Sequence, residues 1–143
     1  MALILDTGVT VALLNVADRN HEVCVRLART ISEPLVVPAA TLVEVDYWVR
    51  KRLSTSAWQT FVRELEAGAY LLEPTTEEDL LRAAELEVQY DDLELGFVDA
   101  AVIALCERLG EKKVATIDRR DFSVVVPRHV ATLELLPHLA TDN

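Results

Sequence analysis

The stretch that decides the fold is residues 1–17, MALILDTGVTVALLNVA, in which Asp6 is the only charged residue. Leu3 to Leu5 form a short continuous apolar run, which is typical of a strand buried on both faces of a parallel sheet. A short helix is expected to follow, over about Val9 to Asn15. Asp6 therefore stands at the carboxyl end of a buried strand, where the chain turns into a helix.

The alternation of short apolar runs and helices continues along the chain. Further strands are expected at Leu35–Val37, Tyr70–Leu72, Val114–Ile117 and, last, either 124–126 or 131–135, of which we favour the second. Helices are expected from Asp18 or Asn20 to about Ile31, over Ala39–Leu53, from Ser54 or Ser56 to Gly68, from a capping box of Thr75 and Glu78 to Tyr90, and over Phe97–Leu109. This order predicts an α/β fold with a mainly parallel sheet.

Four acidic residues lie in apolar surroundings, where a carboxylate is costly unless it is paired or binds a cation. They are Asp6, Glu44 in PAATLVEV, Asp99 in GFVDAAVIALC and Asp118 at the end of VATID. Asp6 and Asp118 each follow a strand, and ligands of open parallel sheets bind off the carboxyl ends of the strands. If the first and fourth strands are neighbours, these two carboxylates face each other. The sequence therefore predicts one shared site for a divalent cation.

Composition limits the class of protein. A chain of 143 residues, 51% of them hydrophobic, predicts one domain with a substantial core. No apolar run approaches the roughly 20 residues that a membrane helix needs. No basic region precedes an apolar stretch at the N-terminus, so a signal peptide is not expected. Cys24 and Cys106 lie in apolar helical segments and are expected to be buried thiols of a cytoplasmic protein.

The net charge of −10 argues against a nucleic-acid partner, but its distribution is uneven. Acidic residues dominate between Glu73 and Glu94, where Arg82 is the one basic residue. Small basic groups occur elsewhere, at Arg50–Arg52, Lys112–Lys113, Arg119–Arg120 and Arg128–His129. The overall charge therefore does not exclude RNA as a partner.

Four segments together resemble the PIN-domain ribonucleases, and most closely the VapC toxins of bacterial toxin–antitoxin pairs. The segments are LILDTGVTVALL with Asp6, TLVEVDYWV with Glu44, LELGFVDAAVIALCERLG with Asp99, and VATIDRRDF with Asp118. Their order and spacing run nearly from end to end of the chain. The resemblance implies an α/β/α sandwich around a five-stranded parallel sheet, as a single PIN domain over residues 1–143.

For function, the resemblance implies hydrolysis of phosphodiester bonds in structured cellular RNA, with Mg²⁺ or Mn²⁺ held by the four acids. Its toxin branch implies a homodimer and a VapB-type antitoxin that blocks the site in a heterotetramer or larger complex. We expect Asp6 and Asp99 to be the most direct ligands, because a mostly hydrated hard cation needs few carboxylates. Asp118 is expected to hold a second ion or a bridging water, and Glu44 to act through water.

Further residues are expected to support the site. The hydroxyl groups of Thr7 and Thr116 are expected to orient water. Asp92 is expected to support the metal ligands without binding the ion itself. Arg119 and Arg120, next to Asp118, are the expected phosphate contacts.

Other residues have competing interpretations. Asp121 competes with Asp118 as the acid that follows the fourth strand. Gly8 departs from the resemblance, because many PIN-domain relatives carry Ser or Asn there, and one water-orienting group is lost. His21 is expected at the surface or at a helix start. The large aromatic side chains are expected in the core or in a dimer contact rather than under RNA bases: Trp48, Trp58 and Phe61.

Two other protein classes share features of this sequence. LILDTG imitates the motif of aspartic proteases, but that class is β-rich and uses many glycines, whereas this chain has four. Receiver domains also carry an acidic pocket on an α/β sheet, but they lack an acid like Glu44 and need a Lys at a strand end, which is not found here. Two alternatives stay open within the PIN fold. One is an RNA-processing nuclease outside a toxin pair, and the other is a binding module that no longer cuts RNA.

Overall fold

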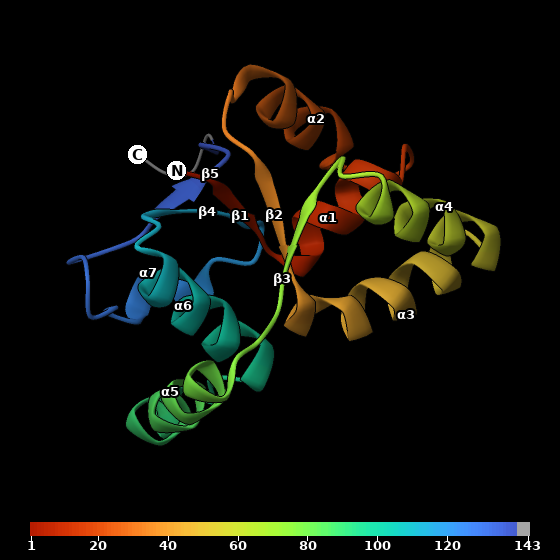
Figure 1. Ribbon diagram of the computed structural model, residues 1–143. Coiled ribbons are helices and arrows are strands. Elements are labelled where there is room, and N and C mark those ends of the chain that lie inside the picture. Colours follow the sequence, from red (N-terminus) through yellow and green to blue (C-terminus); the bar gives the residue numbers. More distant parts are fainter. Residues whose placement is uncertain (140–143) are drawn as a thin grey trace.

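The computed structural model describes residues 1–139, and its centre is a five-stranded parallel sheet with helices on both faces (Figure 1). The strands are β1 (Leu3–Leu5), β2 (Leu35–Pro38), β3 (Leu71–Glu73), β4 (Lys113–Ala115) and β5 (Glu134–Leu136). The α-helices are α1 (Thr7–Leu14), α2 (His21–Thr30), α3 (Leu42–Arg52), α4 (Thr55–Glu66), α5 (Glu77–Gln89), α6 (Phe97–Leu109) and α7 (Arg120–Val124). Two short 3-10 helices are η1 (Ala39–Thr41) and η2 (Asp91–Leu93).

The strand order places the first and fourth strands side by side. The sheet runs β3-β2-β1-β4-β5, and every pair of neighbours is parallel. Ile4 pairs with Val114 and Leu5 with Ala115. The backbone N–H of Asp6 donates to the carbonyl of Ala115 at 2.9 Å. Strands β2 and β3 lie on one side of β1, and β4 and β5 lie on its other side. The carboxyl ends of β1 and β4 therefore meet at a topological switch point, as predicted.

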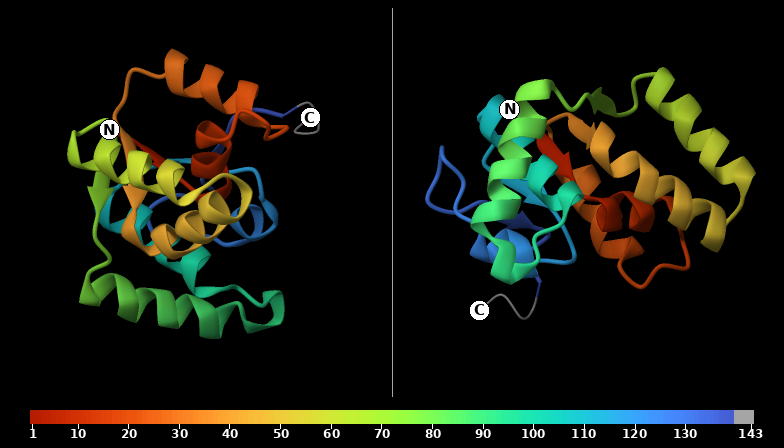
Figure 2. Two further views of the ribbon diagram at one scale, coloured as in Figure 1. Left: turned by 90° about the vertical axis from the view of Figure 1, so that its right-hand side faces the viewer. Right: turned by 90° about the horizontal axis from the view of Figure 1, so that it is seen from below.

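The two faces of the sheet bury separate cores, because successive side chains of a strand point to opposite faces. Ile4 and Val114 belong to the core shared with α5, α6 and α7. Leu5 and Ala115 belong to the core shared with α1, α3 and α4. Figures 1 and 2 show these two groups of helices on opposite sides of the strands. The predicted α/β/α sandwich around a five-stranded parallel sheet is confirmed.

Most predicted elements are present, with shifts at their ends. Helix α6 has the predicted bounds, and the last strand, Glu134–Leu136, overlaps the end of the favoured segment 131–135. The alternative segment, residues 124–126, begins at the last residue of α7 and is not a strand. The predicted capping box of Thr75 and Glu78 is wrong. Instead the Thr76 side chain accepts from the Asp79 N–H at 3.1 Å, and Asp79 Oδ2 accepts from the Thr76 N–H at 3.1 Å.

The interior contains the aromatic and thiol groups that were expected there. Phe61 is fully buried, and its ring lies 5.9 Å from the ring of Trp58, which packs against the same core. Cys24 and Cys106 are buried free thiols, and burial raises the pKa of Cys24 to about 11. Neither cysteine therefore offers a thiolate near neutral pH.

Within residues 1–139, no helix combines the length and the apolar character needed to cross a membrane. The expected single domain over residues 1–143 includes residues 140–143, which lie outside the described residues.

Candidate active site

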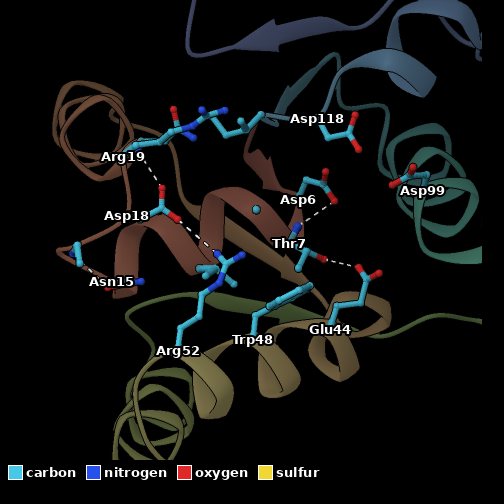
Figure 3. Close-up of a pocket in the computed structure, with 15 residues that line it drawn as sticks. Asp6, Thr7, Asn15, Asp18, Arg19, Glu44, Trp48, Arg52, Asp99 and Asp118 are labelled. Atoms are coloured by element: carbon cyan, nitrogen blue, oxygen red, sulfur yellow. Dashed lines mark hydrogen bonds and ion pairs between the residues drawn. The ribbon is translucent and has the colours of Figure 1, made fainter.

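A cavity of about 800 Å³ opens at the carboxyl ends of β1 and β4, and all four predicted acids line it (Figure 3). Each acid comes from a different element. Asp6 follows β1, Asp118 follows β4, Glu44 projects from α3, and Asp99 lies in the first turn of α6. The fold thus gathers four carboxyl groups that are far apart in sequence.

Asp6 is the most deeply buried of the four acids, with 7% of its surface exposed. It is the N-cap of α1, where its Oδ1 accepts from the Thr7 N–H at 2.8 Å, and its Oδ2 accepts from the Thr116 hydroxyl at 2.9 Å. Burial raises the pKa of Asp6 to about 6, against the lowering effect of these two hydrogen bonds. The charges of Glu44 and Asp118 raise the pKa of Asp6 further.

Asp99 is half-buried and interacts with a fifth acid. Burial raises the pKa of Asp99 well above its usual range, and a hydrogen bond with Asp121 adds to this. The charges of Asp6, Asp121 and Asp118 act in the same direction. Asp118 lines the cavity, whereas Asp121 is hydrogen-bonded to Asp99 and does not line it. Asp118 and Asp121, weighed as alternatives from the sequence, therefore occupy different positions at one site.

Two threonines hold the carboxyl groups in place. The Thr7 hydroxyl donates to Glu44 Oε1 at 2.7 Å, which connects α1 to α3. The Thr116 hydroxyl lies 2.9 Å from Asp6 Oδ2 and 2.9 Å from the carbonyl oxygen of Asp118. Because a hydroxyl has a single proton, it donates to one of these two acceptors at a time. Both threonines lie beside the acids, and their predicted role in orienting water stays a prediction.

Gly8 leaves free space in the wall of the cavity. A Cβ atom at this position would meet Ile117 Cβ at 4.0 Å, which is an ordinary van der Waals contact. A Cβ atom at this position of the cavity wall would therefore cause no clash.

The donor set consists of hard oxygen atoms, which suit Mg²⁺ or Mn²⁺ rather than a softer metal. Within residues 1–139, no three acidic, histidine or cysteine side chains form a closed ligand set for one ion. The four carboxyl groups instead border a common cavity. Mg²⁺ keeps several waters and commonly takes one or two carboxylates from the protein. The residues present therefore fit a largely hydrated ion.

Four predicted residues do not line the cavity: Thr116, Asp92, Arg119 and Arg120. Asp92 is exposed on η2. The Arg119 side chain donates to the carbonyl of Thr116 at 3.1 Å and also to the carbonyl of Pro137. Arg120 donates to the carbonyl of Leu93 at 3.2 Å. Both guanidinium groups thus hold the chain together beside Asp118, and their predicted contact with phosphate stays a prediction, as does the supporting role of Asp92.

The cavity also has a second half that the sequence reasoning missed. Its side chains come from the segment between α1 and α2 and from the later turns of α3: Asn15, Asp18, Arg19, Asn20, Trp48 and Arg52. One signal was available, because Trp48 and Arg52 follow Glu44 at intervals of four residues on a predicted helix.

The family model of the PIN domain matches residues 3–126. This chain belongs to the PIN-domain family. The resemblance to PIN-domain ribonucleases and VapC toxins, drawn from the four acidic segments, is confirmed.

Individual relatives agree with the PIN-domain assignment. The chain is 30% identical over 125 residues to Ribonuclease VapC26 of Mycobacterium tuberculosis. The aligned residues cover 87% of this chain and 93% of the relative. The structure of VapC20 from Mycobacterium tuberculosis, described as a sarcin–ricin loop cleaving toxin, matches with a TM-score of 0.80 and 23% identity, over 90% of this chain and 98% of that one. VapBC2 from Rickettsia felis, bound to a DNA fragment from its promoter, matches with a TM-score of 0.66 and 14% identity, over 95% and 98% of the two chains. The two solved structures share the fold.

Proposed function

We propose that this PIN domain is a metal-dependent ribonuclease toxin of the VapC type, which hydrolyses phosphodiester bonds of structured cellular RNA. The observation that carries the proposal is the convergence of Asp6, Glu44, Asp99 and Asp118 on one cavity. Burial and mutual repulsion raise the pKa of Asp6 to about 6 and that of Asp99 well above its usual range in the metal-free protein. Such a group of carboxyl groups is costly to ionise without a cation, and a cation removes that cost.

Asp6 and Asp99 are the proposed direct ligands of Mg²⁺ or Mn²⁺, with Asp118 at a second ion or a bridging water and Glu44 acting through water. When bound, such an ion lowers the pKa of water, orients it for in-line attack and neutralises charge on the phosphate. The chain itself supplies rigid ligand positions. Thr116 holds Asp6, and Thr7 holds Glu44, so neither carboxylate must be ordered during the reaction.

Asp121 supports Asp99 in this scheme. The hydrogen bond between the two carboxyl groups ties the side chain of Asp99 to that of Asp121 in the metal-free protein. We therefore propose Asp121 as a positioning residue for Asp99 rather than as a replacement for Asp118.

A VapB-type antitoxin is the proposed partner, in a complex that contains a toxin homodimer and is a heterotetramer or larger. The toxin–antitoxin complexes among the structural neighbours support this choice. A basic side chain of the antitoxin, such as Arg, matches the acidic half of the cavity, because bidentate Arg–carboxylate pairs are strong and directional. Inhibition by such a segment would keep the ribonuclease silent in the complex.

The test compares the wild type with Asp99→Asn on total ribosomal RNA and on a synthetic sarcin–ricin loop RNA, which is the target named for VapC20. Assays contain Mg²⁺, Mn²⁺ or a chelator, and sequencing of the RNA ends locates the cleavage. We expect cleavage by the wild type with metal, none with chelator, and a loss of at least about a hundredfold in Asp99→Asn with an unchanged circular dichroism spectrum.

Asp91→Asn is the matched control, because Asp91 is an exposed acid outside the cavity. Cleavage that survives both the chelator and Asp99→Asn would contradict the proposal. A wild type that binds RNA without cutting it would be a binding module. If the protein cleaves RNA but no antitoxin relieves its toxicity, it would be a nuclease outside a toxin pair.

A further inference from the structure

The cavity continues from the four acids into a half of opposite character. Figure 3 shows Arg52 extending from α3 toward Asp18, beside Trp48, with the four acids on the other side of the cavity. Arg19 also lines this half. The two arginines outweigh the single carboxylate of Asp18, so this half carries net positive charge next to a strongly acidic one.

Helix α3 places three different functional groups in a row along the cavity. Glu44, Trp48 and Arg52 are four residues apart and all line it. Residues at this spacing share one helix face and lie about 6 Å apart along the axis. A short piece of extended single-stranded RNA can span this row. An acid at the proposed cleavage centre is thus followed by an aromatic ring and then by a cation.

The guanidinium group of Arg52 is held over an aromatic face and keeps its hydrogen-bond donors. Its central carbon lies 4.5 Å from the centre of the Trp48 ring, which is a cation–π distance. Its Nη1 lies 3.8 Å from Asp18 Oδ2, which is too long for a hydrogen bond, and 47% of the side chain is exposed. Among residues 1–139 no hydrogen-bond acceptor occupies this group, so its donors are available to a phosphate.

We propose that this half of the cavity is a nucleotide subsite, in which Arg52 binds a phosphate next to the cleaved one and the neighbouring base stacks on the layered Trp48 ring and Arg52 guanidinium. The proposal rests on the proposed ribonuclease function and extends it to a substrate contact. Stacking on an aromatic ring together with Arg–phosphate contact is the usual means of holding single-stranded nucleic acid.

RNA fits this half better than an inhibitory protein segment does. A segment that pairs with the four carboxylates must be basic where it meets them, and any further basic side chain next to that point would be repelled by Arg19 and Arg52. A nucleic-acid strand has the complementary requirement, because its phosphate groups are repelled by the acids and attracted by the arginines. A bound cation would offset part of the negative charge of the acidic half, so that the phosphate groups of one strand are less repelled there and are attracted by the basic half.

The experiment measures steady-state cleavage of the sarcin–ricin loop RNA, or of the ribosomal fragment that the wild type cuts, at several salt concentrations. Arg52→Gln is expected to raise KM about tenfold with kcat within about twofold, and to reduce the slope of log(kcat/KM) against log[salt] by about 1. Trp48→Ala is expected to raise KM about tenfold, and Trp48→Phe less, because a phenyl ring still stacks.

Arg50→Gln is the matched control. It removes the same charge from the same helix, but Arg50 is paired with Asp46 at 2.7 Å and does not line the cavity. KM and the salt slope of this variant are expected to equal those of the wild type. Thermal unfolding of each variant separates a binding role from a structural one, since Trp48→Phe and Arg52→Gln should melt close to the wild type.

Unchanged KM and salt slope in Arg52→Gln would overturn the subsite. A fall in kcat and in melting temperature without a change in KM would also overturn it, in favour of a purely structural contact with Asp18. If the wild type cuts neither RNA, the proposed function fails separately. The subsite is then judged by anisotropy of fluorescein-labelled sarcin–ricin loop RNA in Mg²⁺, where equal affinity of the wild type and Arg52→Gln would refute it.

Discussion

Asp6 and Asp99 are the residues whose protonation depends most on the fold. Each is an aspartate that would be ionised near neutral pH in an unfolded chain. In the structure, burial raises the pKa of Asp6 to about 6 and that of Asp99 well above its usual range. Both shifts oppose folding where the unfolded chain is ionised, so the site reduces the stability of the metal-free protein.

The sign follows from proton linkage. Between the ordinary pKa of an aspartate and its raised value, the folded state binds more protons than the unfolded state. The free energy of unfolding therefore falls as the pH rises through this range. For Asp6 the range ends near pH 6, and for Asp99 it extends higher.

Asp99→Asn is expected to stabilise the metal-free protein at pH 8, because it removes a repelled and partly desolvated charge. We expect a gain of about 1–2 kcal/mol in the free energy of unfolding, since solvent reaches part of the side chain. The gain should be much smaller near pH 4, where Asp99 is protonated in the folded state and about half protonated in the unfolded chain. Urea unfolding with a chelator at the two pH values measures it.

Added Mg²⁺ should make the wild type more stable than Asp99→Asn, because a ligand that binds only the folded state stabilises it. The wild type should gain stability from Mg²⁺ and Asp99→Asn should gain less. Asp91→Asn, an exposed acid, should differ little from the wild type at either pH. Destabilisation of the metal-free protein by Asp99→Asn at pH 8 would show that repulsion does not dominate at this position.

At the scale of elements, the start of α5 shows how a neighbouring helix selects a cap. Thr75 with Glu78 and Thr76 with Asp79 have the same spacing, so sequence alone does not separate them. Asp79 is 3% exposed, and its carboxylate accepts from Arg108 of α6 at 3.0 Å. This contact holds Asp79 inward and makes the second pair the capping box.

Thr76→Ala should lower the free energy of unfolding by about 1 kcal/mol, the usual effect of losing an N-cap side chain. Asp79→Ala should lower it more, by about 3 kcal/mol, because Arg108 also loses its buried partner. Thr75→Ala is the control and should change stability by no more than about 0.5 kcal/mol. Chemical unfolding of the three variants measures this, and equal effects of Thr75→Ala and Thr76→Ala would argue against the observed cap.

At the scale of the whole molecule, the strand order and the exposed surface decide assembly and site. The order β3-β2-β1-β4-β5 brings Asp6 and Asp118 together. On the outer side of α5, Leu81 and Val88 are 67% and 79% exposed and lie at helical spacing with the exposed Ala84 between them. Such a stripe is a candidate contact for the homodimer that the VapC resemblance implies.

Leu81→Glu and Val88→Glu are each expected to weaken the proposed homodimer. Each change removes about 1–2 kcal/mol of apolar burial per protomer and adds like charge to an acidic helix, so the dimer dissociation constant should rise at least about tenfold. Analytical ultracentrifugation measures it. Val16→Glu, which changes an 81% exposed side chain outside α5, is the control. If Leu81→Glu and Val88→Glu both remain dimeric at the concentrations at which the wild type is dimeric, the interface lies elsewhere.

Much of the fold is readable in the sequence because local patterns and tertiary requirements agree. Helix α6 was predicted with its bounds because a long apolar segment is closed by Gly110, which has a positive φ of 69°. The last strand was predicted only approximately. Its residues Glu134–Leu136 are defined by pairing with β4, and that pairing depends on the complete sheet.

The acidic half of the site was also readable, because each acid interrupts an apolar run. The basic half was not, since Arg52 and Asp18 resemble ordinary surface residues in the sequence. Only the packing of α3 beside α1 and the segment after it brings them to the same cavity. Likewise, the spacing of Asp118 and Asp121 left open which of them serves the site, and the structure gives them separate contacts.

The sequence by itself determined the alternation of strands and helices and the identity of the four acids that line the cavity, because both follow from local apolar patterns. The tertiary structure decided which strands are neighbours, which threonines hold which carboxylates, and where the cavity changes from negative to positive. These properties depend on distances between side chains remote in sequence, and such distances are set when the sheet closes and the helices pack on its faces.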